Sequence, residues 1–531
     1  MNLLSRFNGN GWLLLPGSAT ACLLALAIPG HTGWWPLLFV ALIPLLLTAT
    51  HTTPGRSAWM GFVCGLLYHL TLLYWILIVL GRYGRLPWWI STPALVLLAA
   101  YLACFTAAFA FLLSRLAGRY RQRERSVALL IWGAPVLWVG LDYLKSIFLS
   151  GFPWMDLGYG LFSQPMLIQA ADLGGHNLLT FSLILCNSLL AGILSKERNA
   201  DRGHNRLAKP LLLLACCFLI GIGGYSVVRY QGVEGSITTA QQAQVAVIQG
   251  NIDQAVKWSA AFKEATVSQY LKLSQKVLQN SKTQLVVWPE TALPFYPQRD
   301  ALVGRIFDFT TANNTWLLTG APLFSITTKT DGSELIRYYN GALLIEPSGK
   351  MSGQHAKQHL VPFGEFVPFR KYLPFLEPLV VSIGDFTPGT SMEPLVLGPM
   401  KLGMLICYES IFPEISRNTV VRGANLLVNL TNDAWYGKSS APYQSLSMAV
   451  LRAVENRRSL IRAANTGISG FVDPLGRVTA QTAIFTEAAL TAQVPMLEQA
   501  TVFGRYGYRF GAACLLLIPL LCLFFRRRRL A

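Results

Sequence analysis

Long apolar runs alternate with short basic stretches over the first 230 residues, and one further run lies near the C-terminus. Each run has roughly 20 residues, the length that a helix needs to cross the hydrocarbon core of a bilayer. The pattern therefore predicts eight transmembrane helices. They occupy residues 11–28, 34–50, 57–80, 88–114, 127–145, 166–194, 210–228 and 508–525.

Positive charges are distributed unevenly between these runs. If the N-terminus is cytoplasmic, the inside segments carry sixteen Lys and Arg residues, with clusters in 115–125, 196–209 and 526–529. The outside segments, apart from the long region 231–500, carry six. Because basic loops stay on the cytoplasmic side, we expect both termini to be cytoplasmic and residues 231–500 to be exported.

The region between the seventh and eighth runs has a different pattern. Short apolar segments such as 244–249 and 402–407 alternate with helical patterns such as 260–280. Strands that are apolar on both faces and alternate with helices are typical of a sheet covered on both sides. The expected organisation is seven membrane helices in 1–230, an exported α/β domain in 231–500, and the eighth helix with a basic cytoplasmic tail in 501–531.

Composition agrees with a membrane protein. Hydrophobic residues make up 53% of the 531-residue chain, and charged residues make up 13%, about half the charged share of a soluble domain. The formal net charge of +18 does not indicate nucleic-acid binding, because residues 231–500 hold 22 basic and 20 acidic side chains. The basic excess lies beside the apolar runs instead, so we expect no nucleic-acid partner.

Cysteine usage singles out Cys407. Eight of the nine cysteines fall in the predicted membrane helices, and only Cys407 lies in the exported region. It ends an apolar strand pattern, at the edge where α/β sheets present reactive groups. A catalytic nucleophile and a buried packing cysteine fit this position equally well.

Two other side chains have chemistry that a thiol could use. Pro289 ends the strand pattern of 284–288 and leaves Glu290 just beyond it, where a carboxylate could act as general base; a helix N-cap partner is the alternative. Lys357 lies in a stretch with little charge. An ammonium beside a thiol lowers its pKa and can neutralise an oxyanion; a solvated surface lysine is the alternative.

Three motifs together resemble a known family. They are WPE at 288–290, KQHLVPFGEFVPF at 357–369 and ICYES at 406–410, and they are similar to the Glu–Lys–Cys motifs of the nitrilase, or carbon–nitrogen hydrolase, superfamily. The HLVPFGE segment and the seven-plus-one arrangement of apolar runs resemble its membrane-bound branch, the apolipoprotein N-acyltransferases. The resemblance implies an αββα sandwich carried by an integral membrane bundle of eight transmembrane helices.

The resemblance also implies roles for individual residues. Cys407 is the expected nucleophile, Glu290 the general base and Lys357 the oxyanion stabiliser. Supporting roles are implied for Glu365, Tyr408 and Glu409. Aromatic residues expected around the acyl or lipid site are Trp258, Trp435, Phe366 and Phe369; for the two tryptophans, ordinary core packing is the alternative.

The activity implied by the resemblance is acyl transfer. A membrane phospholipid, usually phosphatidylethanolamine, would acylate Cys407. The thioester would then acylate the free α-amine of the diacylglyceryl-cysteine of an apolipoprotein, the last step of lipoprotein maturation. The enzyme would lie in the bacterial inner membrane with a periplasmic catalytic domain and no cofactor. A membrane-anchored amidase that cleaves a small C–N bond is the alternative.

Two further patterns concern metal binding and lipid access. His355 and His359 have the i, i+4 spacing of metal ligands on a helix, but no third ligand has suitable spacing, so we expect no metal. The stretch 362–380 is rich in Phe and Pro, which suits a bilayer interface. We interpret it as a lid that admits acyl chains, with a loop packed on its own domain as the alternative.

Overall fold

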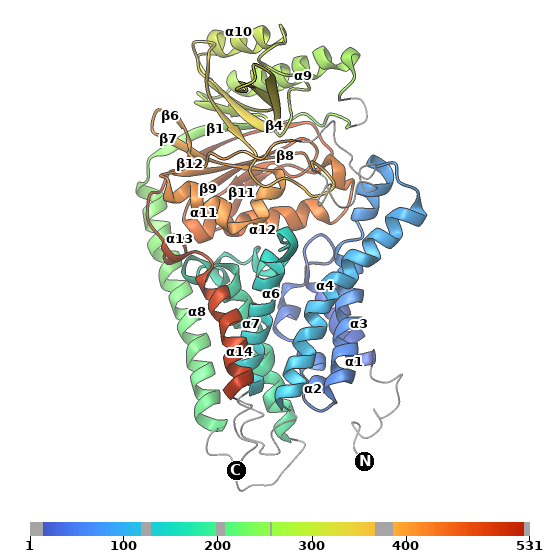
Figure 1. Ribbon diagram of the computed structural model, residues 1–531. Coiled ribbons are helices and arrows are strands. Elements are labelled where there is room, and N and C mark those ends of the chain that lie inside the picture. Colours follow the sequence, from blue (N-terminus) through green and yellow to red (C-terminus); the bar gives the residue numbers. More distant parts are fainter. Residues whose placement is uncertain (1–13, 118–128, 198–207, 255–256, 367–385, 525–531) are drawn as a thin grey trace. The chain divides into compact units, whose positions relative to one another are not determined.

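The computed structural model describes residues 14–117, 129–197, 208–254, 257–366 and 386–524 (Figure 1). They form two compact units. One unit comprises Met1–Ile76, Trp89–Gln231 and Tyr506–Ala531, and the other comprises Leu77–Trp88 and Gly232–Arg505.

The first unit is helical. Three of its helices, α4 (Trp88–Ala117), α7 (Ala171–Glu197) and α8 (Ala208–Thr239), are long and apolar enough to cross a membrane. The chain is thus a membrane protein with several apolar helices. The shorter helices are α1 (Leu14–Ala27), α2 (Ile43–Ala49), α3 (Pro54–Leu72), α6 (Ala134–Ile147) and α14 (Arg509–Phe524).

Helical segments lie within all eight predicted runs, but several runs are not continuous α-helices. Residues 34–50 divide into the 3-10 helix η2 (Trp35–Phe39) and α2, and α7 is interrupted at Gly174 and Gly175. The run at 57–80 is helical as α3 only to Leu72, and η3 (Ile78–Tyr83) is a π-helical turn that belongs to the second unit. The count of eight spans and their orientation remain predictions.

Buried charges in the helical unit are paired. The Lys145 ammonium lies 2.9 Å from Asp142 and 2.7 Å from Asp156, and His176 lies 3.0 Å from the other oxygen of Asp156. Ionisable side chains are costly among apolar helices, and such pairing reduces the cost of burying them.

The second unit contains two six-stranded sheets. The first has the order β12-β1-β2-β3-β4-β5, and the second has the order β11-β10-β9-β8-β7-β6. The strands of the first sheet are β1 (Gln242–Gln249), β2 (Leu285–Val287), β3 (Trp316–Thr328), β4 (Glu334–Ile345), β5 (Met351–Ala356) and β12 (Ala488–Pro495). Those of the second are β6 (Leu395–Leu397), β7 (Met400–Ile406), β8 (Leu426–Thr431), β9 (Ser459–Ala464), β10 (Gly470–Val472) and β11 (Val478–Gln481).

The two sheets pack face to face through one apolar core. This core joins Val245 and Val287 of the first sheet to Met404 and Val428 of the second. Helices α9 (Ala260–Leu278) and α10 (Val303–Asn313) pack on the outer side of the first sheet, and α11 (Pro413–Val421) and α12 (Ala441–Asn456) pack on that of the second (Figure 1). The unit is an αββα sandwich, which confirms the expected fold of this part.

The central strands of each sheet are parallel. Strands β1, β2 and β3 run in one direction, as do β7, β8 and β9. Because both faces of each sheet are covered, these strands read as continuous apolar runs; all six residues of β8 are buried. The residues that follow β2 and β7, including Glu290 and Cys407, therefore emerge at strand ends.

Substitution of Gly320 should test how closely β3 supports the turn that carries Glu290. A Cβ at Gly320 would lie 2.5 Å from the Pro289 carbonyl oxygen and 2.6 Å from the Glu290 Cα. Gly320→Ala should cost about 1–3 kcal/mol of stability because backbone atoms must move, and it should slow catalysis. Thermal unfolding and an activity assay measure both effects.

Gly304→Ala is the matched control. Gly304 lies in α10, and no atom outside its chain neighbours and the adjacent helix backbone lies within 4 Å of its added Cβ. Alanine should therefore leave stability unchanged or slightly raised. Equal stability and activity of the two variants would contradict the close packing of β3 against the turn that carries Glu290.

Candidate active site

Three segments of the αββα unit bring the predicted Glu, Lys and Cys together. Glu290 follows β2, Lys357 follows β5 directly, and Cys407 follows β7. The Lys357 Nζ lies 3.9 Å from Glu290 Oε1 and 2.9 Å from Glu365 Oε2. The charges of Glu290 and Lys357 both act on the Cys407 thiol.

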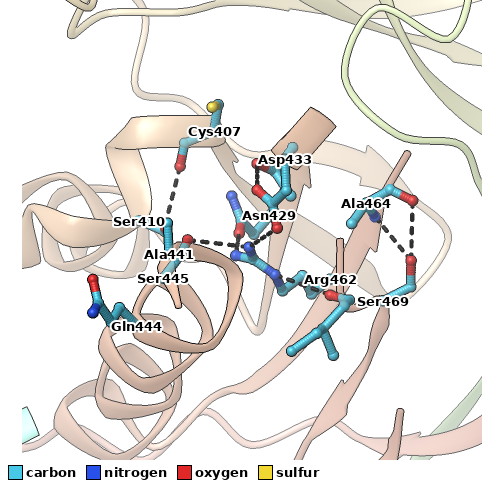
Figure 2. Close-up of polar contacts among 12 residues, drawn as sticks. Cys407, Ser410, Asn429, Asp433, Ala441, Gln444, Ser445, Arg462, Ala464 and Ser469 are labelled. Atoms are coloured by element: carbon cyan, nitrogen blue, oxygen red, sulfur yellow. Dashed lines mark hydrogen bonds and ion pairs between the residues drawn. The ribbon is translucent and has the colours of Figure 1, made fainter. Parts of the chain in front are cut away.

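Cys407 occupies a strained turn. Its φ is 53°, in the left-handed region, where strand β7 passes into the 3-10 turn η9 (Cys407–Ile411). A residue other than glycine costs on the order of 1–3 kcal/mol in this conformation. Ser410 Oγ donates to the Cys407 carbonyl oxygen at 3.1 Å (Figure 2).

The Cys407 thiol is protonated at neutral pH. Burial and the nearby Glu290 carboxylate raise its pKa to about 12, although Lys357 and a hydrogen bond with Thr431 act in the opposite direction. The thiolate is the nucleophilic form of cysteine. Any attack by this sulfur therefore needs a base that takes its proton.

Lys357 is buried and remains charged. Burial alone would lower the pKa of its ammonium, but Glu365, Cys407 and Glu290 together raise it above its usual range. Asn340, from β4, donates from Nδ2 to Glu290 Oε1 and to Glu365 Oε1, both at 2.7 Å. The two carboxylates are thus bridged by one amide and share one cation.

The three buried carboxylates differ in hydrogen bonding. Glu365 accepts from Asn340 and Lys357 on Oε1 and from the Val361 N–H on Oε2. Both oxygens of Glu409 also accept hydrogen bonds. Among the residues that the structure describes, Glu290 Oε2 is buried with no hydrogen-bond partner. Glu290 is therefore the carboxylate with an oxygen available for a proton.

Glu409 connects the lysine segment to the cysteine turn. Its side chain is fully buried and accepts the backbone N–H of Gln358 at 2.6 Å, His359 at 3.0 Å and Ile406 at 2.7 Å. Tyr408 is also buried, and its ring packs edge-on against Phe412 with centroids 5.0 Å apart. Both of these predicted supporting residues therefore belong to the turn after Cys407.

A second buried network lies beside Cys407 (Figure 2). Arg462 of β9 is fully buried and donates to Asp433 at 3.0 Å, to Ser445 at 3.1 Å and to Asn429. The other oxygen of Asp433 accepts from Thr431 at 2.8 Å. Because Thr431 hydrogen-bonds with the Cys407 thiol, the network reaches the sulfur.

The predicted lipid-binding aromatics are only partly described. Trp258 is 41% exposed, and Trp435 is partly buried with its ring 5.5 Å from that of Tyr83, so neither is an ordinary core tryptophan. Phe366 is partly buried and its carbonyl oxygen accepts from the Phe363 N–H at 2.9 Å. Phe369 and most of the proposed lid at 362–380 lie outside the described residues.

The sequence patterns do not single out several residues of the site. Asn340 and Arg462 each interrupt an otherwise apolar strand pattern, and Lys257 stands directly before Trp258. A polar side chain within a buried strand needs internal partners, so the interruption was a usable signal. It did not identify those partners, because they come from distant segments.

Comparison with known proteins gives the class of the chain. The carbon-nitrogen hydrolase family model matches residues 244–501, which include Glu290, Lys357 and Cys407. The model for the apolipoprotein N-acyltransferase N-terminal domain matches residues 20–189. The protein is thus a nitrilase-superfamily enzyme with an additional N-terminal membrane domain.

Relatives that align with nearly the whole chain identify the family within this superfamily. The chain is 43% identical to an apolipoprotein N-acyltransferase of Geobacter metallireducens, over 93% of this chain and 91% of that protein. It is 31% identical to the apolipoprotein N-acyltransferase of Pseudomonas putida, over 98% and 97% of the two chains. The chain therefore belongs to the apolipoprotein N-acyltransferase family, and these relatives are bacterial.

The solved structures to which this chain is similar include nitrilase-superfamily proteins. Nit3 of Saccharomyces cerevisiae, a member of branch 10 of the superfamily, is 20% identical with a TM-score of 0.37. The match covers 48% of this chain and 90% of that one.

Glu409→Gln should show how much the link between the lysine segment and the cysteine turn contributes. An amide nitrogen cannot accept the N–H groups that the carboxylate accepts, so the variant should lose about 1.5–3 kcal/mol of stability and acylate Cys407 more slowly. Chemical unfolding and the rate of acyl-enzyme formation measure the two effects. Glu264→Gln, whose side chain is 75% exposed, should change neither, and an effect of similar size there would contradict the prediction.

Proposed function

We propose that Cys407 carries the transferred acyl group as a thioester, with Glu290 as general base and Lys357 as oxyanion stabiliser. As a family member, the enzyme is an N-acyltransferase of lipoprotein maturation. The observation that carries the proposal is the free oxygen of Glu290 beside a protonated thiol and a permanently charged lysine.

The first half-reaction forms the thioester. Glu290 Oε2 takes the Cys407 proton as sulfur attacks the ester carbonyl of a phospholipid, and Lys357 offsets the negative charge on the carbonyl oxygen. The backbone N–H of Tyr408 is a candidate second donor. The C–O bond of the ester then breaks, and the proton on Glu290 passes to the oxygen of the departing lysophospholipid.

The second half-reaction forms the amide. The free α-amine of the diacylglyceryl-cysteine of an apolipoprotein attacks the thioester, a C–N bond forms and the C–S bond breaks. A proton leaves the amine through Glu290 and returns to the Cys407 sulfur. Exclusion of water from the site favours aminolysis over hydrolysis. Glu365, Tyr408 and Glu409 would hold the catalytic groups in place.

Both proposed substrates are membrane lipids. Three long apolar helices support a membrane location, and anchoring of enzyme and substrates in one bilayer raises their effective concentration. We propose phosphatidylethanolamine as the usual donor. Trp258, Trp435, Phe366 and Phe369 are the proposed contacts for acyl chains, and the segment 362–380 is the proposed lid.

The distribution of basic residues and the bacterial relatives support a location in the bacterial inner membrane. We propose eight transmembrane helices, both termini in the cytoplasm and a periplasmic catalytic domain at 231–500. Residues 1–230 would hold seven of the helices, and residues 501–531 would hold the eighth with the basic tail.

The acyl-enzyme can be detected directly. Purified enzyme incubated with phosphatidylethanolamine should gain the mass of one fatty acyl group, which hydroxylamine should remove. Cys407→Ala should lack this mass, whereas Cys104→Ala, which removes an exposed thiol in α4, should retain it. Acyl mass that persists in Cys407→Ala would refute the assignment, and turnover of a small amide without amine acylation would favour the amidase alternative.

Glu290 and Lys357 should both be needed before the thioester forms. One removes the thiol proton and the other offsets oxyanion charge, and loss of such an electrostatic donor costs roughly 10²–10³ in rate. Glu290→Gln and Lys357→Ala should therefore acylate Cys407 at least that much more slowly in single-turnover mass measurements. Acylation at the wild-type rate in either variant would return that residue to a structural role.

A further inference from the structure

Lys257 is a fully buried lysine that the proposed chemistry does not use. It lies between β1 and α9, immediately before Trp258. Its ammonium donates a long hydrogen bond of 3.5 Å to the backbone carbonyl oxygen of Glu290. Among the described residues, this is the one side-chain hydrogen bond of Lys257.

Such a lysine needs a compensating charge. Removal of an ammonium from water costs several kcal/mol, and one long hydrogen bond to a neutral carbonyl recovers little of that cost. Burial lowers the pKa of Lys257 to about 8, and the Glu290 carboxylate limits this decrease. The interaction is mutual: the Glu290 carboxylate stabilises the Lys257 ammonium, and the Lys257 ammonium stabilises the Glu290 carboxylate to the same extent.

The charges around Glu290 show why a second cation is useful there. Glu290 and Glu365 are bridged by Asn340 and share the single ammonium of Lys357. Two carboxylates that share one cation favour a proton on one of them. Of the two, Glu290 has the free oxygen, and a proton there would block its action as a base.

The other titratable groups near Glu290 do not supply this positive charge. The Cys407 thiol and the Tyr436 hydroxyl both interact with Glu290, and burial raises the pKa of each, so both are neutral at pH 7. Lys257 and Lys357 are therefore the two ammonium groups whose charges interact with Glu290.

We propose that Lys257 is a positioning residue for acyl-enzyme formation, whose ammonium keeps Glu290 in the ionised form that accepts the Cys407 proton. It acts through Glu290, so the inference rests on the base role proposed for that residue. The chemistry of the thioester step is unchanged, and Lys257 sets the range of pH over which that step is fast.

The test is the pH dependence of acyl-enzyme formation, followed by intact mass in single turnover with phosphatidylethanolamine. The rate of acyl-enzyme formation should rise with pH on the acidic side of the pH–rate profile, here called the acidic limb. In Lys257→Met and Lys257→Gln, the midpoint of this acidic limb should move to higher pH by about one unit, within the range that a neighbouring opposite charge produces. The rate on that limb should fall about tenfold, because one pH unit is a factor of ten in proton concentration. At high pH the rates should approach wild type.

Three variants separate charge from packing. Lys257→Arg retains the cation and should keep the wild-type limb. Lys257→Gln keeps a hydrogen-bond donor without charge, and it stands in for Lys257→Met if methionine prevents folding. Lys263→Met is the matched control, because it removes a lysine of α9 that pairs with Asp300 and should leave the limb in place.

An unshifted limb in Lys257→Gln, or an equal loss of rate at every pH, would overturn the inference and leave Lys257 as a packing residue. A shift of the same size in Lys257→Arg would overturn it as well, because the charge is retained there. Failure of the proposed function has a different signature: Cys407→Ala would still carry the acyl group, or Glu290→Gln would acylate normally, whatever Lys257 does.

Discussion

The catalytic unit depends on one buried cation. The Lys357 ammonium lies between the carboxylates of Glu365 and Glu290 and is almost fully buried. Because a buried ammonium is costly without acidic partners, the position of Lys357 determines where both carboxylates must lie, and Asn340 then bridges them. The turn after β2, strand β4, the end of β5 and the loop to Glu365 are thereby held together. Loss of Lys357 would remove the ion-pair partner that both carboxylates share, so the cluster is stable only as a whole.

The buried carboxylates of Glu290, Glu365 and Glu409 differ in how many of their oxygens accept hydrogen bonds. Glu365 and Glu409 have both carboxylate oxygens occupied, and they hold Lys357 and the Cys407 turn in place. Glu290 keeps one oxygen free among the described residues. Hydrogen bonds to a carboxylate favour its charged form, although burial still raises the pKa of Glu409 to about 7. The free oxygen of Glu290 can accept a proton without displacing a hydrogen bond. This difference in hydrogen bonding separates the proposed base from its supports.

The sequence predicts the parts of this arrangement that depend on local pattern. Pro289 ends an apolar strand and Cys407 follows another, so both reactive groups could be placed at strand ends, and the alternation of strands and helices predicts the sandwich. The left-handed φ of Cys407 could not be predicted, because a cysteine has no intrinsic preference for it. The neighbours of Asn340 and Arg462 could not be predicted either. A polar residue within an apolar strand needs hydrogen-bond partners, but the sequence does not identify them. Residues 77–88 belong to the same compact unit as the αββα sandwich. This could not be predicted, because it depends on tertiary contacts and the sequence shows only an apolar run that continues to residue 80.

The surroundings of the partly buried Cys407 have consequences for both proposed half-reactions. With a pKa near 12, the sulfur is a thiol between turnovers, and thiols oxidise more slowly than thiolates, which protects it at the proposed periplasmic location. In the proposed mechanism, the nucleophile forms only when Glu290 takes the proton, so activation coincides with attack on the donor. When the amine later displaces the sulfur, the departing thiolate is strongly basic in these surroundings and takes a proton back. The environment that makes a base necessary in the first step thus drives the return of the thiol in the second.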